Sequence, residues 1–341
     1  MKYYLIILSS LLLFSCQEEI TLDLPQAEEK LVVEGSIEPG FPPYVILSTN
    51  QSYFDPIDVE TYNNIFVSNA TEVKVWYIDE YQDTITKYLE KIEIDSFPPI
   101  YTDIDYINNL LNGSNSEYDF SKQGYTYYLE IKWNNKTITS QTTIPFSTSL
   151  DSVWVEKSER DEKEFKCDIK AIYSDPAEIQ NNILVKSKRL QHFKKDSCNS
   201  VSKSDFLFLL VDAGSDVLFN GEQFETYFPK PSENGGFPNG TYNTSRYRNC
   251  NDGEDSIFLD HDVVLIKFCQ IDEPSMKFWR GLTRQSGSNG NPFAEPLNLP
   301  SNINGGLGVW TGYGSTYYKV PIIKETVIFE EYIPENIFDI L

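Results

Sequence analysis

The strongest constraint on the fold is a series of short segments in which apolar and polar residues alternate. In residues 71–78 (TEVKVWYI), Val73, Val75 and Tyr77 fall on the same side of an extended chain. Because successive side chains of a strand point to opposite faces, this period of two predicts a half-buried β-strand. Similar segments recur along the chain and are separated by glycine, proline and asparagine, so we expect a mostly β protein.

The first half of the chain predicts a compact β domain over residues 30–147. Its expected strands are residues 30–37, 44–49, 71–78, 83–89, 124–133 and 136–144, with a short helical turn near 107–111. Asn134 and Asn135 separate the last two strands, and such a two-residue loop is typical of a β-hairpin. The pattern favours a β-sandwich of immunoglobulin or transthyretin-like type.

Residues 148–341 predict a second β-rich domain. Its expected strands are residues 151–157, 164–173, 182–193, 206–211, 256–270 and 317–329. The period changes over residues 272–287, where Met276, Trp279 and Leu282 fall three apart on one face. Asp272 suits the N-cap position of a helix. We therefore expect one amphipathic helix that covers the second sheet.

The first sixteen residues, MKYYLIILSSLLLFSC, have the pattern of a secretion signal that ends in a lipidation site. Lys2 gives a short positive region, and the apolar run that follows is too short to span a bilayer as a permanent helix. Cys16 stands where a small-residue cleavage site belongs and completes a lipobox. We expect residues 1–15 to be removed as a signal peptide and Cys16 to carry the lipid.

A polar tether, residues 16–29, follows this anchor. Its first residues are Gln17, Glu18 and Glu19, and a short acidic tract after the lipidated cysteine resembles the surface-export signal of Bacteroidota-type lipoproteins. We therefore expect a protein held in the outer membrane through acyl chains and facing the cell exterior. Because no other segment approaches eighteen apolar residues, we expect no transmembrane helix.

The charge of the chain argues against nucleic acid as a partner. It has 51 acidic and 28 basic residues, which gives a formal net charge of −23. Such a chain lacks the basic surface that phosphate backbones require. The charge favours a soluble, self-repelling surface.

Four cysteines besides the lipidation site allow two disulfides, because an even count is common in exported proteins. Cys198 and Cys250 lie in polar, loop-like sequence, and we favour that pair. Cys167 lies on the apolar face of its predicted strand and is equally compatible with a buried free thiol. Cys269 is the fourth of these cysteines. No spacing of cysteine and histidine residues predicts a metal site.

The sequence offers few residues for catalysis. His192 lies among basic residues, and His261 stands between two aspartates that should point to the opposite face of its strand. The segment NCNDGED (249–255) carries oxygen ligands but lacks the spacing of a calcium-binding EF-hand. With so little histidine, a Ser-His-Asp triad or a zinc hydrolase is not expected, and neither is a cofactor.

The most distinctive local sequence is GGLGVWTGYG, residues 305–314. Its glycines predict a bulged strand that lets another chain segment approach closely. The alternative is a partner or ligand surface with Trp310 and Tyr313 as its anchors. The segment does not match a nucleotide-binding glycine loop, because it does not lead from a strand into a helix.

Several of these motifs together resemble a known group of Bacteroidota lipoproteins. They are the lipobox, ITLDLP (20–25), LVVEGSI (31–37), the Asp175-Pro176 step, DVLFNG (216–221) and NPFAEPLNLPSNINGGLGVWTGY (291–313). This family is called domain of unknown function 4249, and the resemblance covers nearly the whole mature chain. It implies an outer-membrane lipoprotein often encoded beside a TonB-dependent receptor, and it brings no catalytic residues.

The residues and the resemblance favour a non-catalytic surface lipoprotein. We expect an accessory or substrate-binding partner of a TonB-dependent outer-membrane transporter. A surface hydrolase of glycans or peptides is the second hypothesis, since paired carboxylates can come from any part of a fold. A purely structural or adhesive lipoprotein is the third.

Overall fold

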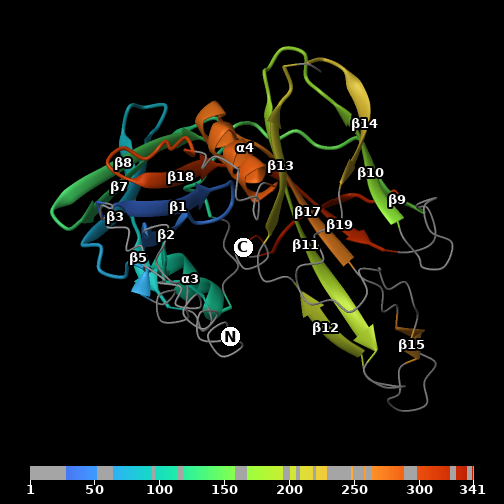
Figure 1. The fold of residues 1–341 in the computed structure, drawn as a ribbon, viewed down its shortest axis with the longest axis horizontal. Coiled ribbons are helices and arrows are strands. Elements are labelled where there is room, and N and C mark those ends of the chain that lie inside the picture. Colours follow the sequence, from blue (N-terminus) through green and yellow to red (C-terminus); the bar gives the residue numbers. More distant parts are fainter. Residues whose placement is uncertain are drawn as a thin grey trace, which may run out of the picture.

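The computed structural model describes residues 28–51, 64–93, 97–113, 118–157, 167–194, 200–204, 208–217, 220–228, 247–248, 257–258, 263–287, 298–322, 328–335 and 340. Over this part the chain is mostly β, as the alternating segments predict, and its helices are α3 (Ile104–Leu111) and α4 (Glu273–Gly287). Figure 1 shows the N-terminal strands on one side, a long sheet built on β11 on the other, and α4 between them.

Two sheets form the N-terminal two-layer unit. The first has the order β18 (Leu307–Gly312), β1 (Leu31–Ile37), β2 (Tyr44–Thr49), β6 (Ile100–Thr102), β5 (Glu90–Ile92). The second has the order β4 (Thr84–Tyr88), β3 (Glu72–Ile78), β7 (Thr126–Trp133), β8 (Lys136–Thr143). Val33 and Leu47 of the first sheet share one buried cluster with Val75 and Leu129 of the second. The two sheets therefore pack face to face around a common core.

The hairpin between β7 and β8 is confirmed. Asn134 and Asn135 have φ angles of +48° and +58°. A two-residue loop with both φ angles positive is the type I′ turn that matches the twist of the strands it joins. The short helical segment expected near residues 107–111 is also present, as the longer helix α3.

Two further sheets form the C-terminal two-layer unit. The central sheet has the order β12 (Ser200–Ser204), β11 (Asn182–Lys194), β17 (Val263–Gln270), β19 (Gly314–Pro321), β20 (Glu331–Tyr332), and β13 (Leu209–Ser215) also pairs with β11. The outer sheet has the order β14 (Gln223–Phe228), β10 (Cys167–Ser174), β9 (Ser152–Lys157). Val155 and Ile169 of the outer sheet pack against Ile266 and Val320 of the central sheet. A short pair, β15 (Tyr247–Arg248) and β16 (Ile257–Phe258), completes the strands.

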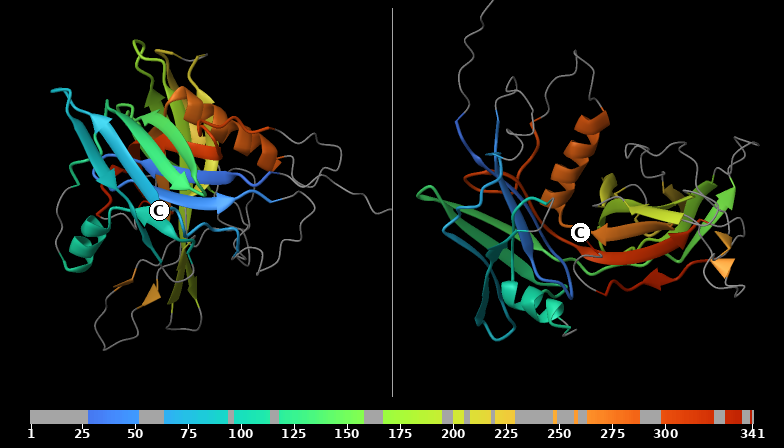
Figure 2. Two further views of the ribbon diagram at one scale, coloured as in Figure 1. Left: turned by 90° about the vertical axis from the view of Figure 1, so that its left-hand side faces the viewer. Right: turned by 90° about the horizontal axis from the view of Figure 1, so that it is seen from below.

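Helix α4 covers the other face of the central sheet, as the sequence predicts. Asp272 caps it, because its Oδ1 accepts the backbone N–H of Ser275 at 3.0 Å. Met276 and Trp279 are buried against Leu184 of β11. Figure 2 shows the helix lying between the two units. Among the described residues, no helix is both long and apolar enough to cross a bilayer.

The run 307–321 belongs to both units. Its first part, β18, pairs in parallel with β1, and its second part, β19, pairs antiparallel with β17. A strand from the range that we assigned to the second domain, 148–341, therefore completes the first sheet. At position 308 of this run only glycine fits, because a Cβ there would lie 2.0 Å from the Val33 carbonyl oxygen.

Two of the sequence motifs meet in space at one end of the C-terminal unit. The buried Asp175 carboxylate accepts hydrogen bonds from the Tyr173 hydroxyl, the Asn181 side chain and the backbone N–H of Gly221. The Asp216 carboxylate accepts the backbone N–H of Asn181. The Asp175-Pro176 step and the 216–221 segment thus hold each other in place through buried carboxylates, which require such partners.

Candidate functional site

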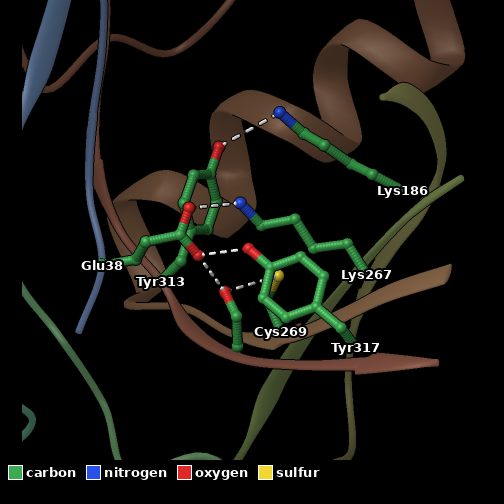
Figure 3. A network of polar contacts seen from close by, with 7 residues as sticks. Glu38, Lys186, Lys267, Cys269, Tyr313 and Tyr317 are labelled. Carbon is green, nitrogen blue, oxygen red and sulfur yellow. Dashed lines mark hydrogen bonds and ion pairs between the residues drawn. The ribbon is translucent and has the colours of Figure 1, made fainter. Parts of the chain in front are cut away.

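The candidate site lies on the face of the central sheet that is turned toward the N-terminal unit. Lys186 of β11 and Lys267 of β17 are directly opposite each other across an antiparallel strand pair. Cys269 follows on the same face of β17, because alternate residues of a strand share a face. The neighbouring strand β19 adds Ser315 and Tyr317. Strands of one sheet therefore place two amines, a thiol and two hydroxyl groups together (Figure 3).

Glu38 is the acidic centre of this group. It follows β1 directly, and its Oε1 accepts a hydrogen bond from Lys267 Nζ at 2.7 Å. Its Oε2 accepts from Ser315 Oγ at 2.7 Å and from Tyr317 Oη at 2.6 Å. Glu38 and Lys267 are each only 3% exposed. This pair links the two units, and the additional hydroxyl donors supply what a buried ion pair needs to be tolerated.

Among the described residues, Lys186 has no comparable acidic partner. Its Nζ donates a hydrogen bond to Tyr313 Oη at 3.3 Å and lies 4.2 Å from the centre of the Trp279 ring. Within the part of the chain that the structure describes, no carboxylate forms an ion pair with it at 4 Å or less. Burial, with the nearby Lys267 charge as a smaller cause, lowers the pKa of Lys186 from 10.5 to about 8.

The thiol and phenols around the ion pair stay protonated. The Ser315 hydroxyl hydrogen is used on Glu38, so the Cys269 thiol donates across the 3.4 Å contact with Ser315 Oγ. Burial raises the pKa of Cys269 to about 11. Burial also raises the pKa of Tyr313 and Tyr317 well above 10, and the Glu38 charge contributes in both cases. Tyr317 and Cys269 therefore act as hydrogen-bond donors, and the Tyr313 hydroxyl oxygen accepts from Lys186.

A cavity of about 270 Å³ opens beside the two lysines, between the N-terminal and C-terminal units. We call it the lysine cavity. Its polar wall consists of Glu34, Tyr44, Lys186 and Lys267. Its apolar wall consists of Ile46, Phe66, Phe97, Pro98, Ile100, Phe208 and Ile340. Apolar walls with a few convergent polar groups are the usual make-up of a small-molecule site.

In two other cavities, the described wall residues include no basic side chain. One, of about 420 Å³, lies beside Pro39, Phe41 and Tyr332. The other, of about 180 Å³, lies inside the C-terminal unit beside Tyr173 and Phe268. The lysine cavity is therefore the one of these three whose described wall contains basic side chains.

Trp310 and Tyr313 are not surface anchors, which corrects one reading of the glycine-rich segment. Trp310 is 0% and Tyr313 is 1% exposed. The Trp310 ring packs in the core of the N-terminal unit, and its Nε1 donates to the Tyr127 carbonyl oxygen at 3.3 Å. The segment instead forms a close-packed strand, which is the other interpretation of its glycines. Tyr313 belongs to the candidate site only through its hydroxyl group beside Lys186.

Most of the other residues that the sequence singles out lie outside the described part of the chain. Cys16, Cys198, Cys250, His261 and the segment 249–255 lie outside the described residues. Cys269 is a free, buried thiol, so it takes no part in a disulfide. The backbone of His192 lies in β11 opposite Ser202. Across the described ranges, no group of three or more His, Cys, Asp or Glu side chains is placed to hold a metal ion.

Sequence reasoning did not single out the residues that form the site. Glu38, Lys186 and Lys267 were not candidates, because an isolated charge carries no motif. A signal is nevertheless present in β17, whose sequence VVLIKFCQ is apolar on both faces except at Lys267 and Gln270. A lysine within such a run needs a buried partner.

Fold and site define a class: a mostly β protein whose two packed units enclose a small chamber with a lysine in its wall. The chain belongs to the family described as Domain of unknown function (DUF4249), whose model matches residues 17–319. A search of curated proteins found no match for the chain.

Proposed function

We propose that the protein is a non-catalytic, lipid-anchored binding protein of the outer membrane that faces the cell exterior. It binds a small ligand and works beside a TonB-dependent transporter. In this proposal the N-terminal unit, residues 30–147, is an immunoglobulin or transthyretin-like sandwich that is closed by β18. The second domain, residues 148–341, supplies the other wall of the ligand chamber.

The single observation that carries the binding function is the lysine cavity. Its lysines come from the central sheet, and much of its apolar wall comes from the N-terminal unit. Pockets at the junction of two packed units are common ligand sites. Lys186 faces this chamber without an acidic partner among the described residues, which supports a role in binding rather than in stability.

The sequence supports the location and the partner. The lipobox at Cys16 and the acidic tract after it indicate a lipid anchor and surface export. A tether of about a dozen residues reaches roughly 40 Å when fully extended, which suits work against a neighbour in the same membrane. The family resemblance supports a TonB-dependent transporter as that neighbour.

Affinity purification of the full-length protein from detergent-solubilised outer membranes tests this proposal. The matched control is Cys16→Ala, which removes the lipidated thiol and leaves the folded domains unchanged. We expect the natural protein, and not the control, to be recovered from the outer membrane together with a TonB-dependent transporter. Recovery without any transporter, combined with unchanged uptake in a deletion strain, would reject the proposal.

A further inference from the structure

We propose that the lysine cavity binds a small organic monocarboxylate with an apolar body, and that the carboxylate group pairs with Lys186. This inference rests on the proposed binding function and names the chemical class of the ligand. Charge, hydrogen bonding and shape at the cavity each support it.

The charge on Lys186 favours an anionic ligand. Like charges directly opposite each other on paired strands destabilise a sheet, and Lys186 stands opposite Lys267. Lys267 is paired with Glu38 at 2.7 Å, whereas among the described residues Lys186 has no carboxylate within ion-pair distance. A negative group placed beside Lys186 would offset part of the repulsion and part of the penalty of burial.

The Lys186 ammonium group has hydrogen-bond donors that a ligand can use. An ammonium group has three donors, and Lys186 uses one of them on the Tyr313 hydroxyl group. The Trp279 and Tyr313 rings lie 4.2 and 5.3 Å from its Nζ and hold the amine in place. A carboxylate oxygen can accept a short, charge-assisted hydrogen bond from one of the remaining N–H groups.

The size and polarity of the chamber suit a small ligand with an apolar body. A cavity of about 150 Å³ with apolar walls is large enough for benzene. The lysine cavity, at about 270 Å³, therefore accommodates one ring or a short branched chain together with a carboxylate group. Phe66, Phe97 and Phe208 offer aromatic surface to such a body.

The other charges of the wall select a single negative charge. Glu34, an exposed residue, lines the cavity, and Glu38 lies behind the wall, where it is paired with Lys267. A ligand with two negative charges, such as a phosphate ester, would meet repulsion from these carboxylates after the first charge is balanced. A monocarboxylate brings one negative charge, which can pair with Lys186, and it meets less repulsion from Glu34 than a dianion does.

Fluorine NMR on the full-length, lipidated protein in nanodiscs tests the inference with para-fluorophenylacetate as the probe. The matched neutral ligand is para-fluorophenylacetamide, which has nearly the same shape. Lys186→Met removes the amine, and Lys277→Met, at an exposed position on α4, is the matched control variant. Ile46→Trp fills the apolar part of the chamber.

We expect the natural protein and Lys277→Met to bind the acid at least about tenfold more tightly than the amide, as a hydrogen bond to a charged group predicts. Lys186→Met should lose that preference, and Ile46→Trp should lose binding of both probes. Equal affinity for acid and amide, an unchanged preference in Lys186→Met, or no binding of the acid at millimolar concentration would each overturn the inference. Recovery of the transporter with the protein is measured independently, so this inference can fail while the proposed function stands.

Discussion

Replacing Lys186 by methionine should stabilise the protein near neutral pH while it removes the proposed ligand contact. Burial and the opposing Lys267 lower the pKa of Lys186 from 10.5 to about 8, which means that the folded state disfavours the charged amine. One pKa unit corresponds to about 1.4 kcal/mol, so the penalty is at most about 3 kcal/mol. Because the side chain keeps partial solvent access, we expect the variant to gain about 1–2 kcal/mol in unfolding free energy at neutral pH.

The stability difference between the natural protein and Lys186→Met should depend on pH. Between pH 8 and pH 10.5 the unfolded chain holds the Lys186 proton more tightly than the folded chain does, so the natural protein gains stability as pH rises. The penalty is fully present below pH 8 and is absent above pH 10.5. The advantage of Lys186→Met should therefore shrink across this interval. The other titratable groups near the amine are Glu34, Glu38, Tyr44, Lys188, Lys267, Cys269 and Tyr313, and the variant retains all of them.

Urea unfolding followed by tryptophan fluorescence, at a series of pH values, measures the difference between the two proteins. Lys277→Met serves as the control, because its amine is exposed and pairs with Glu273 on the same helix. A Lys186→Met variant that is less stable than the natural protein at neutral pH would contradict this prediction. A difference in unfolding free energy that stays constant between neutral pH and pH 10.5 would contradict it as well.

Three further outcomes follow from the structure. Glu38→Gln leaves the Lys267 ammonium buried without a counter-charge, so urea unfolding should show a loss of about 3–5 kcal/mol. Gly308→Ala should lose about 2–4 kcal/mol in the same assay, because φ is +97° and a Cβ would collide with the carbonyl oxygen of the neighbouring strand. Gly40→Ala, also at positive φ but with open space around it, should lose only about 1–2 kcal/mol; equal losses would contradict the close-contact explanation. Cys269 should resist iodoacetamide in the folded protein and react after unfolding, as judged by peptide mass spectrometry, because burial raises its pKa to about 11; labelling of this thiol in the folded protein would contradict the prediction.

Local features of the fold could be predicted from sequence because their causes are local. The Asn134-Asn135 hairpin depends on two residues that tolerate positive φ. Helix α4 depends on the Asp272 cap and on apolar residues at helical spacing. The pairing of β18 with β1 could not be found in this way, since it joins strands roughly 275 residues apart and no local pattern specifies such a partner.

The candidate site escaped prediction for a related reason. Glu38 and Lys267 are separated by more than two hundred residues and meet where the run 307–321 pairs first with β1 and then with β17. Trp310 and Tyr313 are aromatic residues in a distinctive glycine-rich segment, which suggests a binding surface, but both side chains are buried. Strand alternation places residues on a face, but it does not say what lies against that face.

The double membership of the run 307–321 has a consequence for the order in which the chain folds. Until this run has emerged, β1 has an unpaired edge and Glu38 lacks two of its donors, Ser315 and Tyr317. Because pairing over such a distance carries a large loop-closure entropy, the last pairing should be the slow one. The N-terminal unit is thus synthesised first and completed last, and its open edge is exposed to other chains throughout that interval.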